Sequence, residues 1–384
     1  MKKYHVCGLG NALVDTEIEV SEKNLSDLGI EKGLMTLVDE ERQHFLQDSL
    51  SDHLVMSKRA CGGSAANTVI SLSQFGGKGF LSCKVADDEN GQFYMQDLMD
   101  NGVDHNADAQ MSQGITGKCL VMITDDADRT MNTFLGISSD LAPVDVDPEA
   151  IENSEYLYIE GYLVTGESSL NAVLEACEVA RQAGTKIALS LSDPGIVEYF
   201  RDGLKSIVGD GVDLLFCNQQ EALSWCQTDN LDQALEQLQD SAAQFAVTLG
   251  SEGAVVFDGS DYLRAAAQPI TAVDTNGAGD MFAGAYLYGI TQGYSSLSAA
   301  VFANRAASAV VGQYGPRLHS AEYDGLKKEI FKLEKKYNYL STLHLTKNIV
   351  GAANSVIEHN KTKLDKVVWT ANDAGEKVKV NRSL

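Results

Sequence analysis

The sequence predicts an α/β fold in which a mostly parallel central sheet is flanked by helices, in three layers, and carries a small β-sheet lid. From about residue 154 onward, short apolar runs alternate with segments of helical periodicity. Strands and helices that alternate at these lengths form right-handed βαβ units on one mostly parallel sheet. The half-exposed strands near the start of the chain cannot all belong to that buried sheet, so they indicate a separate lid.

The N-terminal part supplies the first strand of the sheet and most of the lid. Residues 4–10 form an apolar run typical of a buried strand, whereas residues 14–20 alternate polar and apolar side chains, as a half-exposed strand does. Further expected elements are a helix over 64–75, a strand over 78–85 and strand-like sequence over 115–135. We therefore assign 1–12, 55–103 and 142–335 to an α/β catalytic domain, and 13–54 and 104–141 to the β lid.

The second half of the chain continues the central sheet. The expected strands cover 156–159, 186–191, 213–217 and 245–249, the helices cover 170–182, 196–207, 221–226 and 279–289, and a hairpin covers 253–262. In open sheets of this kind, ligands bind beyond the carboxyl ends of the strands. A charged helix is expected over 327–339, and residues 336–384 form a C-terminal extension of unknown role.

The composition excludes several classes of protein. A net charge of −24 argues against nucleic acid or anionic membrane as partners. No window of about 18 uncharged apolar residues indicates a membrane span, and no secretory signal is evident, so a cytoplasmic location is expected. The seven cysteines are scattered without a C-x-x-C pair, which suits neither a zinc site nor a disulfide framework.

The segment with the strongest chemical signal is Asp274-Thr275-Asn276-Gly277-Ala278-Gly279-Asp280. Small residues allow a tight turn, and the free N–H groups of the helix that begins here form an anion site. A carboxylate beside such a site suits phosphoryl transfer, because the amides stabilise the moving phosphoryl group while Asp280 accepts the proton of an attacking hydroxyl. The alternative is a glycine-rich helix start that Asp280 merely caps. No Walker A loop is present, since no Gly-Lys-Ser/Thr follows.

Three motifs together resemble the PfkB (ribokinase-like) family of carbohydrate and nucleoside kinases. The Asp274–Asp280 segment resembles the C-terminal signature of that family, Asp-Thr-x-Gly-Ala-Gly-Asp. Cys61-Gly62-Gly63-Ser64-Ala65-Ala66-Asn67 resembles its Gly-Gly-x-x-x-Asn signature, and Asn218-Gln219-Gln220-Glu221 its Asn-x-x-Glu motif. The motifs occur in family order within residues 1 to about 320. The resemblance implies a ribokinase-like fold and an ATP-dependent kinase.

The resemblance also implies a role for each matching residue. Asp280 is the expected general base, with Gly277, Ala278 and Gly279 as the anion hole. Gly62, Gly63 and Asn67 are expected to contact substrate hydroxyl groups, and Asn218 and Glu221 to organise Mg²⁺ through water. The expected ATP site consists of Asn218, Thr248, Gly250, Gly253, Thr275 and, as an adenine-side or merely structural residue, Asn304. The implied cofactors are ATP and Mg²⁺, with a monovalent cation such as K⁺ as a further candidate.

Three more residues are candidates for the site. Asp15 lies just past the first strand, where a carboxylate can accept two hydrogen bonds from a vicinal diol; the alternative is an exposed strand residue. Arg129, on an expected lid strand, could close over the phosphates, or lie solvated at the surface. Tyr162 follows sequence similar to the segment where adenosine kinase-like members stack a ring on the purine; a core tyrosine is the alternative.

The sequence is compatible with more than one phosphoryl acceptor. Asn11-Ala12-Leu13-Val14-Asp15 is similar to the entry strand of adenosine kinase-like members, which favours the 5′-hydroxyl of adenosine or another purine nucleoside. A sugar kinase acting on ribose, fructose or a ketodeoxy sugar acid is the alternative. A non-catalytic, ligand-sensing homologue is disfavoured because Asp280 and the anion hole are intact. The expected partners are therefore small molecules, and the chain is expected to be a monomer or a homodimer.

Overall fold

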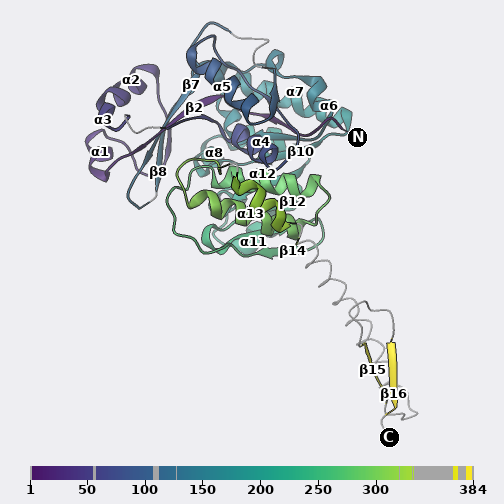
Figure 1. Ribbon diagram of the computed structural model, residues 1–384. Coiled ribbons are helices and arrows are strands. Elements are labelled where there is room, and N and C mark those ends of the chain that lie inside the picture. Colours follow the sequence, from purple (N-terminus) through teal and green to yellow (C-terminus); the bar gives the residue numbers. More distant parts are fainter. Residues whose placement is uncertain are drawn as a thin grey trace. The chain divides into compact units, whose positions relative to one another are not determined.

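The computed structural model describes residues 2–54, 58–106, 112–126, 128–319, 321–330, 332, 366–370 and 378–382. The chain divides into two compact units, Met1–Lys328 and Glu329–Leu384. The first unit contains a large sheet, a small sheet and their helices (Figure 1). In the second unit, the described residues include one antiparallel strand pair, β15 (Lys366–Thr370) with β16 (Val378–Arg382).

The large sheet has nine strands in the order β14-β13-β12-β11-β10-β9-β1-β5-β6. Its strands from β12 to β6 pair in parallel, and only the β12-β13-β14 edge is antiparallel. The bounds are β1 Tyr4–Leu9, β5 Gly79–Ser82, β6 Val103–His105, β9 Ser154–Glu160, β10 Lys186–Ser190, β11 Val212–Asn218, β12 Ala242–Thr248, β13 Ala254–Phe257 and β14 Tyr262–Ala265. The expected mostly parallel central sheet is thus confirmed.

Helices cover both faces of this sheet, because its strands are apolar on both sides. One face packs Leu157, Leu189, Leu215 and Phe245 against the apolar sides of α6 to α11. On the other face, Phe216 meets Tyr286 of α12 edge to face. The helical bounds are α4 Ser64–Gln74, α5 Glu89–Asp100, α6 Pro148–Glu152, α7 Glu167–Ala183, α8 Pro194–Tyr199, α9 Arg201–Val208, α10 Gln219–Cys226, α11 Leu231–Leu238, α12 Ala278–Thr291 and α13 Ser296–Val311.

The small sheet, to which we give the name lid, has five strands in the order β3-β8-β7-β2-β4. Its elements are β2 Leu13–Glu19, β3 Met35–Leu37, β4 Lys58–Gly62, β7 Gly117–Ile123 and β8 Arg129–Phe134, with helices α1 Glu22–Asp27, α2 Glu40–Ser49 and α3 Ser51–Leu54. A separate small core, which includes Ile18, Leu46 and Met122, holds α1 and α2 against the sheet. In Figure 1 this layer, with α1, α2 and α3, stands at one side of the main body.

Several expected boundaries differ from the observed ones. Strand β4 belongs to the lid, although the sequence pattern assigns 55–103 to the main layer, because its backbone pairs with β2 rather than with β5. The single helix expected over 196–207 is two helices, α8 and α9, separated at Phe200. The charged helix expected over 327–339 is described only in part, since residues 321–330 are helical and 333–339 lie outside the described residues. None of the helices in the described part of the chain has the length and apolar character that a membrane crossing requires.

Candidate active site

One cavity lies where the carboxyl ends of the central strands meet the lid. Asn11, Glu160, Asn218 and Thr248 line it from the ends of β1, β9, β11 and β12 or just beyond them. Because parallel strands place their carboxyl ends at one edge, side chains far apart in sequence converge there. The lid adds a second wall, and the start of α12 a third. Further residues that line the cavity include Leu13, Asp15, Met35, Leu37, Gly63, Ser64, Asn67, Arg129, Met131, Leu135, Tyr162, Glu221, Thr275, Asn276, Gly277, Ala278, Gly279 and Asp280.

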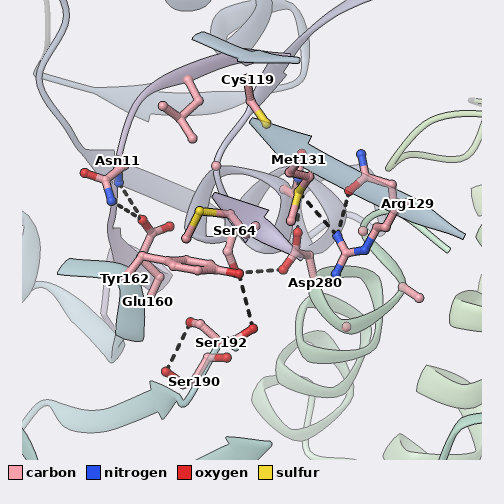
Figure 2. A pocket seen from close by; sticks show the side chains of 18 of the residues that line it. Asn11, Ser64, Cys119, Arg129, Met131, Glu160, Tyr162, Ser190, Ser192 and Asp280 are labelled. Atoms are coloured by element: carbon pink, nitrogen blue, oxygen red, sulfur yellow. Dashed lines mark hydrogen bonds between the residues drawn. The ribbon is translucent and has the colours of Figure 1, made fainter. Parts of the chain in front are cut away.

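Asp280 lies in the first turn of α12, close to Ser64 at the start of α4 (Figure 2). Its Oδ1 accepts a hydrogen bond from Ser64 Oγ at 2.7 Å, and its Oδ2 accepts one from Asn67 Nδ2 at 3.1 Å. Loss of hydration raises the pKa of this carboxyl above its usual value, while those two hydrogen bonds and the charge of Arg129 oppose the rise. The carboxylate is therefore oriented by two donors and can accept a proton.

The loop before α12 brings backbone N–H groups to the cavity. Gly277 has φ +71, and a Cβ there would lie 2.5 Å from Cβ of Pro316, so only glycine fits this turn. Asp274, which is fully buried, fixes the loop by accepting hydrogen bonds from the N–H groups of Asn276 at 2.8 Å and Gly315 at 2.9 Å. The first turn of α12 starts at Ala278, whose N–H donates to the Thr275 carbonyl oxygen at 3.3 Å, and the free N–H groups of a helix start such as this one suit an anion.

The Gly62-Gly63 pair lies between lid strand β4 and helix α4. A Cβ at Gly62 would lie 2.0 Å from Oδ1 of Asp15, so the absent side chain leaves room for that carboxylate. Gly63 has φ +89 and caps α4. Burial raises the pKa of Asp15 to about 8, the Glu17 carboxylate adds to the rise, and Arg317 opposes it. Asp15, Gly63 and Asn67 line the cavity. Gly62 does not line it, and instead leaves the space that the Asp15 carboxylate occupies.

Arg129 and Tyr162 both line the cavity, from opposite sides. Arg129 Nη1 donates to Asn276 Oδ1 at 2.9 Å, so this side chain is not merely solvated at the surface. It connects lid strand β8 to the loop 274–277 before α12, which is the expected anion-binding loop. Tyr162 donates from its hydroxyl to the Ser192 carbonyl at 3.3 Å, and its ring packs beside the main core (Figure 2). The side chain of Tyr162 is half-buried and also lines the cavity.

Asn218 and Glu221 form a reciprocal capping box at the start of α10. The Glu221 N–H donates to Asn218 Oδ1 at 2.8 Å, and the Asn218 N–H donates to Glu221 Oε2 at 3.0 Å. Burial raises the pKa of Glu221 to about 7. Within the described residues, no three His, Cys, Asp or Glu side chains gather as a direct metal site. A cation at Glu221 would therefore keep water or phosphate oxygens among its ligands.

Four expected site residues are not among the described residues that line the cavity: Gly62, Gly250, Gly253 and Asn304. Asn304 is buried and donates from Nδ2 to the Ala265 carbonyl at 2.7 Å, which is a structural contact between α13 and β14. Gly253 has φ +98, and a Cβ there would lie 2.1 Å from the same carbonyl. These two residues thus shape the turn around Ala265.

The cavity residues that sequence reasoning missed include Glu160 and Ser64. Glu160 is buried and accepts hydrogen bonds from the backbone N–H groups of Asn11 and Ala65, each at 2.8 Å. Burial raises the pKa of this carboxyl to about 7, although those N–H groups oppose the rise. The sequence feature that could have identified Glu160 as a site residue is a carboxylate at the end of an apolar strand. Nothing local marks Ser64 as the donor to Asp280.

Comparison with known proteins agrees with this geometry. Residues 33–322 match the family model described as pfkB family carbohydrate kinase. An adenosine kinase of Saccharomyces cerevisiae is 28% identical over 304 residues, which cover 74% of this chain and 88% of that protein. The structure of an adenosine kinase from Sinorhizobium meliloti superimposes with a TM-score of 0.80 at 34% identity, covering 85% of this chain and 99% of that one.

A protein described as a probable sugar kinase, from Rhizobium etli, is equally similar in structure. Its TM-score is 0.79 at 34% identity, and the match covers 85% of this chain and all of that one. The ribokinase-like architecture and the family expected from the three motifs are therefore confirmed. The chain belongs to the pfkB family of carbohydrate kinases and is accordingly a phosphotransferase with an alcohol group as its acceptor.

Proposed function

We propose that this kinase transfers the γ-phosphoryl group of ATP to the 5′-hydroxyl of a purine nucleoside, with adenosine as the preferred acceptor. The observation that carries the proposal is the apolar wall that the lid presents to the cavity. It consists of Leu13, Met35, Leu37, Met131 and Leu135. A free sugar bears polar groups around its whole ring, whereas a nucleoside has one polar end and one flat, weakly polar base.

The polar part of the cavity matches the ribose end of such an acceptor. Asp15 and Asn67 line the same cavity, and the buried Asn67 Oδ1 has no hydrogen-bond partner among the described residues. A buried carbonyl oxygen without a partner favours a ligand that donates to it. With its hydroxyls held by Asp15, Gly63 and Asn67, a ribose would direct its 5′-hydroxyl toward Asp280, and the base would lie between the apolar wall and Tyr162.

The reaction then needs three contributions from the protein. Asp280 accepts the proton of the 5′-hydroxyl as that oxygen attacks phosphorus. The amides of Gly277, Ala278 and Gly279 stabilise the charge on the transferring phosphoryl group. Arg129 neutralises part of the same charge from the lid side, once it exchanges its contact with Asn276 for the phosphate.

ATP and Mg²⁺ would occupy the β11–β12 side of the cavity. Thr248 and Thr275 line it, and Gly250 and Gly253 shape the adjoining turn for ATP, with Asn304 supporting that turn. The oxygen donors of Asn218 and Glu221 fit a hard cation that retains water, and Mg²⁺ would supply charge neutralisation at the phosphates. A monovalent cation remains a further candidate. We expect the protein to act in the cytoplasm as a monomer or homodimer.

A sugar kinase is the second candidate function, and one feature favours it. Glu160, Asn11 and Asp15 form a strongly polar corner of the cavity, which could hold more hydroxyl groups than a ribose carries. The similarity to a probable sugar kinase from Rhizobium etli points the same way. Ribose, fructose and ketodeoxy sugar acids are the acceptors to test. A non-catalytic homologue is disfavoured because Asp280 retains both of its hydrogen-bond donors.

Two measurements test the proposal. A coupled assay that follows ADP release should give adenosine the highest kcat/KM among purine nucleosides, ribose, fructose and ketodeoxy sugar acids; a preference for a free sugar would refute the nucleoside assignment. Asp280→Asn keeps an oxygen for Ser64 but cannot accept the proton, so kcat should fall by a factor of about 10² or more. Asp213→Asn changes a carboxylate that holds the Ile187 N–H outside the cavity, and it should leave kcat unchanged.

A further inference from the structure

A partly buried ion pair lies behind the Gly62-Gly63 turn, outside the residues to which the reaction assigns a role. Arg317 Nη1 and Asp97 Oδ2 are 2.8 Å apart, with only 14% and 21% of their side chains exposed. Asp97 comes from α5 and Arg317 from the segment after α13. Exposed ion pairs contribute little to stability, but an enclosed pair that also makes directed hydrogen bonds can fix local geometry.

Both members of the pair hold the backbone of the same lid residue, Cys61. Asp97 Oδ2 accepts a hydrogen bond from the Cys61 N–H at 2.9 Å, and Arg317 Nη2 donates to the Cys61 carbonyl oxygen. Strand β4 is an edge strand of the lid sheet, so one side of its backbone lacks a neighbouring strand. Carboxylate and guanidinium take the place of that neighbour at Cys61, immediately before Gly62 and Gly63.

The segment that carries Arg317 is also fixed to the anion-binding loop. Gly315 donates its N–H to Asp274 at 2.9 Å, and Pro316 fills the space where a side chain at Gly277 would lie. Arg317 is the next residue in the chain. A continuous set of contacts therefore runs from the anion-binding loop, through 315–317, to Cys61 and the turn beside Asp15.

We propose that the Arg317–Asp97 pair has a positioning role. It fixes the position of the Gly62-Gly63 turn relative to the anion-binding loop, and so aligns the acceptor hydroxyls with Asp280. The inference rests on the proposed role of Gly63, Asp15 and Asn67 in holding those hydroxyls. Neither Arg317 nor Asp97 touches the reacting atoms. Their loss should affect acceptor binding more than ATP binding, because the β11–β12 side of the cavity does not depend on the turn.

The test separates acceptor binding from general stability. Arg317→Met should raise the acceptor KM about tenfold, since a hydrogen bond from a charged donor is lost, while the ATP KM stays within about twofold of the wild type. Arg317→Lys keeps the charge but not the forked geometry, and Asp97→Asn keeps an acceptor for the Cys61 N–H. Both milder variants should give an intermediate acceptor KM, and they decide the question if Arg317→Met does not fold.

Lys84→Met provides a matched control. Lys84 is likewise 14% exposed, pairs with the buried Asp145 at 2.9 Å and donates to the backbone carbonyl of Asp140. The Lys84→Met substitution should lower the melting temperature of the protein without raising the acceptor KM. The proposal is wrong if the Arg317 and Asp97 variants behave like this control. Each assay uses the acceptor that the wild-type enzyme prefers, so a wild type that prefers a sugar contradicts the nucleoside assignment and still leaves this inference testable.

Discussion

The buried carboxyl of Asp15 gives the clearest pH dependence expected of this enzyme. Its side chain lies behind Gly62, 6% exposed, and its pKa is raised to about 8. Burial is the largest cause, Glu17 and Asp280 add negative charge, and Arg317 and Arg129 oppose them. An ionised carboxylate accepts hydrogen bonds from two hydroxyls, whereas a protonated carboxyl loses part of that capacity. Acceptor binding should therefore strengthen as pH rises through 8.

The size of the effect follows from the pKa. At pH 7 roughly one molecule in ten carries an ionised Asp15, so ionising the rest costs about 1.4 kcal/mol. If the acceptor binds only the ionised form, the acceptor KM should fall about tenfold per pH unit below 7 and level off above 8. A carboxylate whose pKa is lowered by a salt bridge would already be fully ionised at neutral pH, so it would give no change in the acceptor KM over this pH range.

The assay compares the wild type with Asp15→Asn at saturating ATP between pH 6 and pH 9. Asparagine does not titrate, so the ratio of the two acceptor KM values removes the effects of Glu160 and Glu221, whose pKa values are raised to about 7. The two enzymes should be similar near pH 6 and differ about tenfold or more at pH 9. A ratio that stays constant across this range would refute the assignment of Asp15 as an ionised acceptor of hydroxyl hydrogen bonds.

Two further predictions concern helix α12, which carries Asp280, and the proposed metal-binding residue Glu221. A Cβ at Gly284 would lie 2.4 Å from the Thr68 carbonyl oxygen, so Gly284→Ala should force α12 away from α4. The substitution should destabilise the protein by about 1–3 kcal/mol and lower kcat, because it displaces Asp280. Gly325→Ala, where a Cβ meets nothing within 4 Å, is the control in thermal unfolding and should be neutral or stabilising. Glu221→Gln should raise the Mg²⁺ concentration needed for half-maximal rate, whereas Glu178→Gln on the exposed side of α7 should not; equal Mg²⁺ requirements would exclude Glu221 from the metal site.

Much of the fold was predictable because its strands are buried on both faces and therefore read as short apolar runs. The strands from β9 to β12 and helices α4, α7 and α12 match their expected positions within a few residues. Strand β4 was not predictable in the same way, since it is short and polar and its pairing with β2 depends on contacts distant in sequence. The break between α8 and α9 at Phe200 likewise carries no Gly or Pro signal.

For the site, the sequence by itself determined the chemistry, and the tertiary structure decided the arrangement. A glycine-rich helix start beside Asp280 needs only local geometry, because the amides and the carboxylate belong to one turn of α12. The donors that orient Asp280, Ser64 and Asn67, lie more than two hundred residues away in sequence and come into contact only when α4 packs on α12. The same holds for Glu160, for the bridge from Arg129 to Asn276 and for the Arg317–Asp97 pair. Such contacts depend on how distant elements pack, which no local pattern of residues specifies.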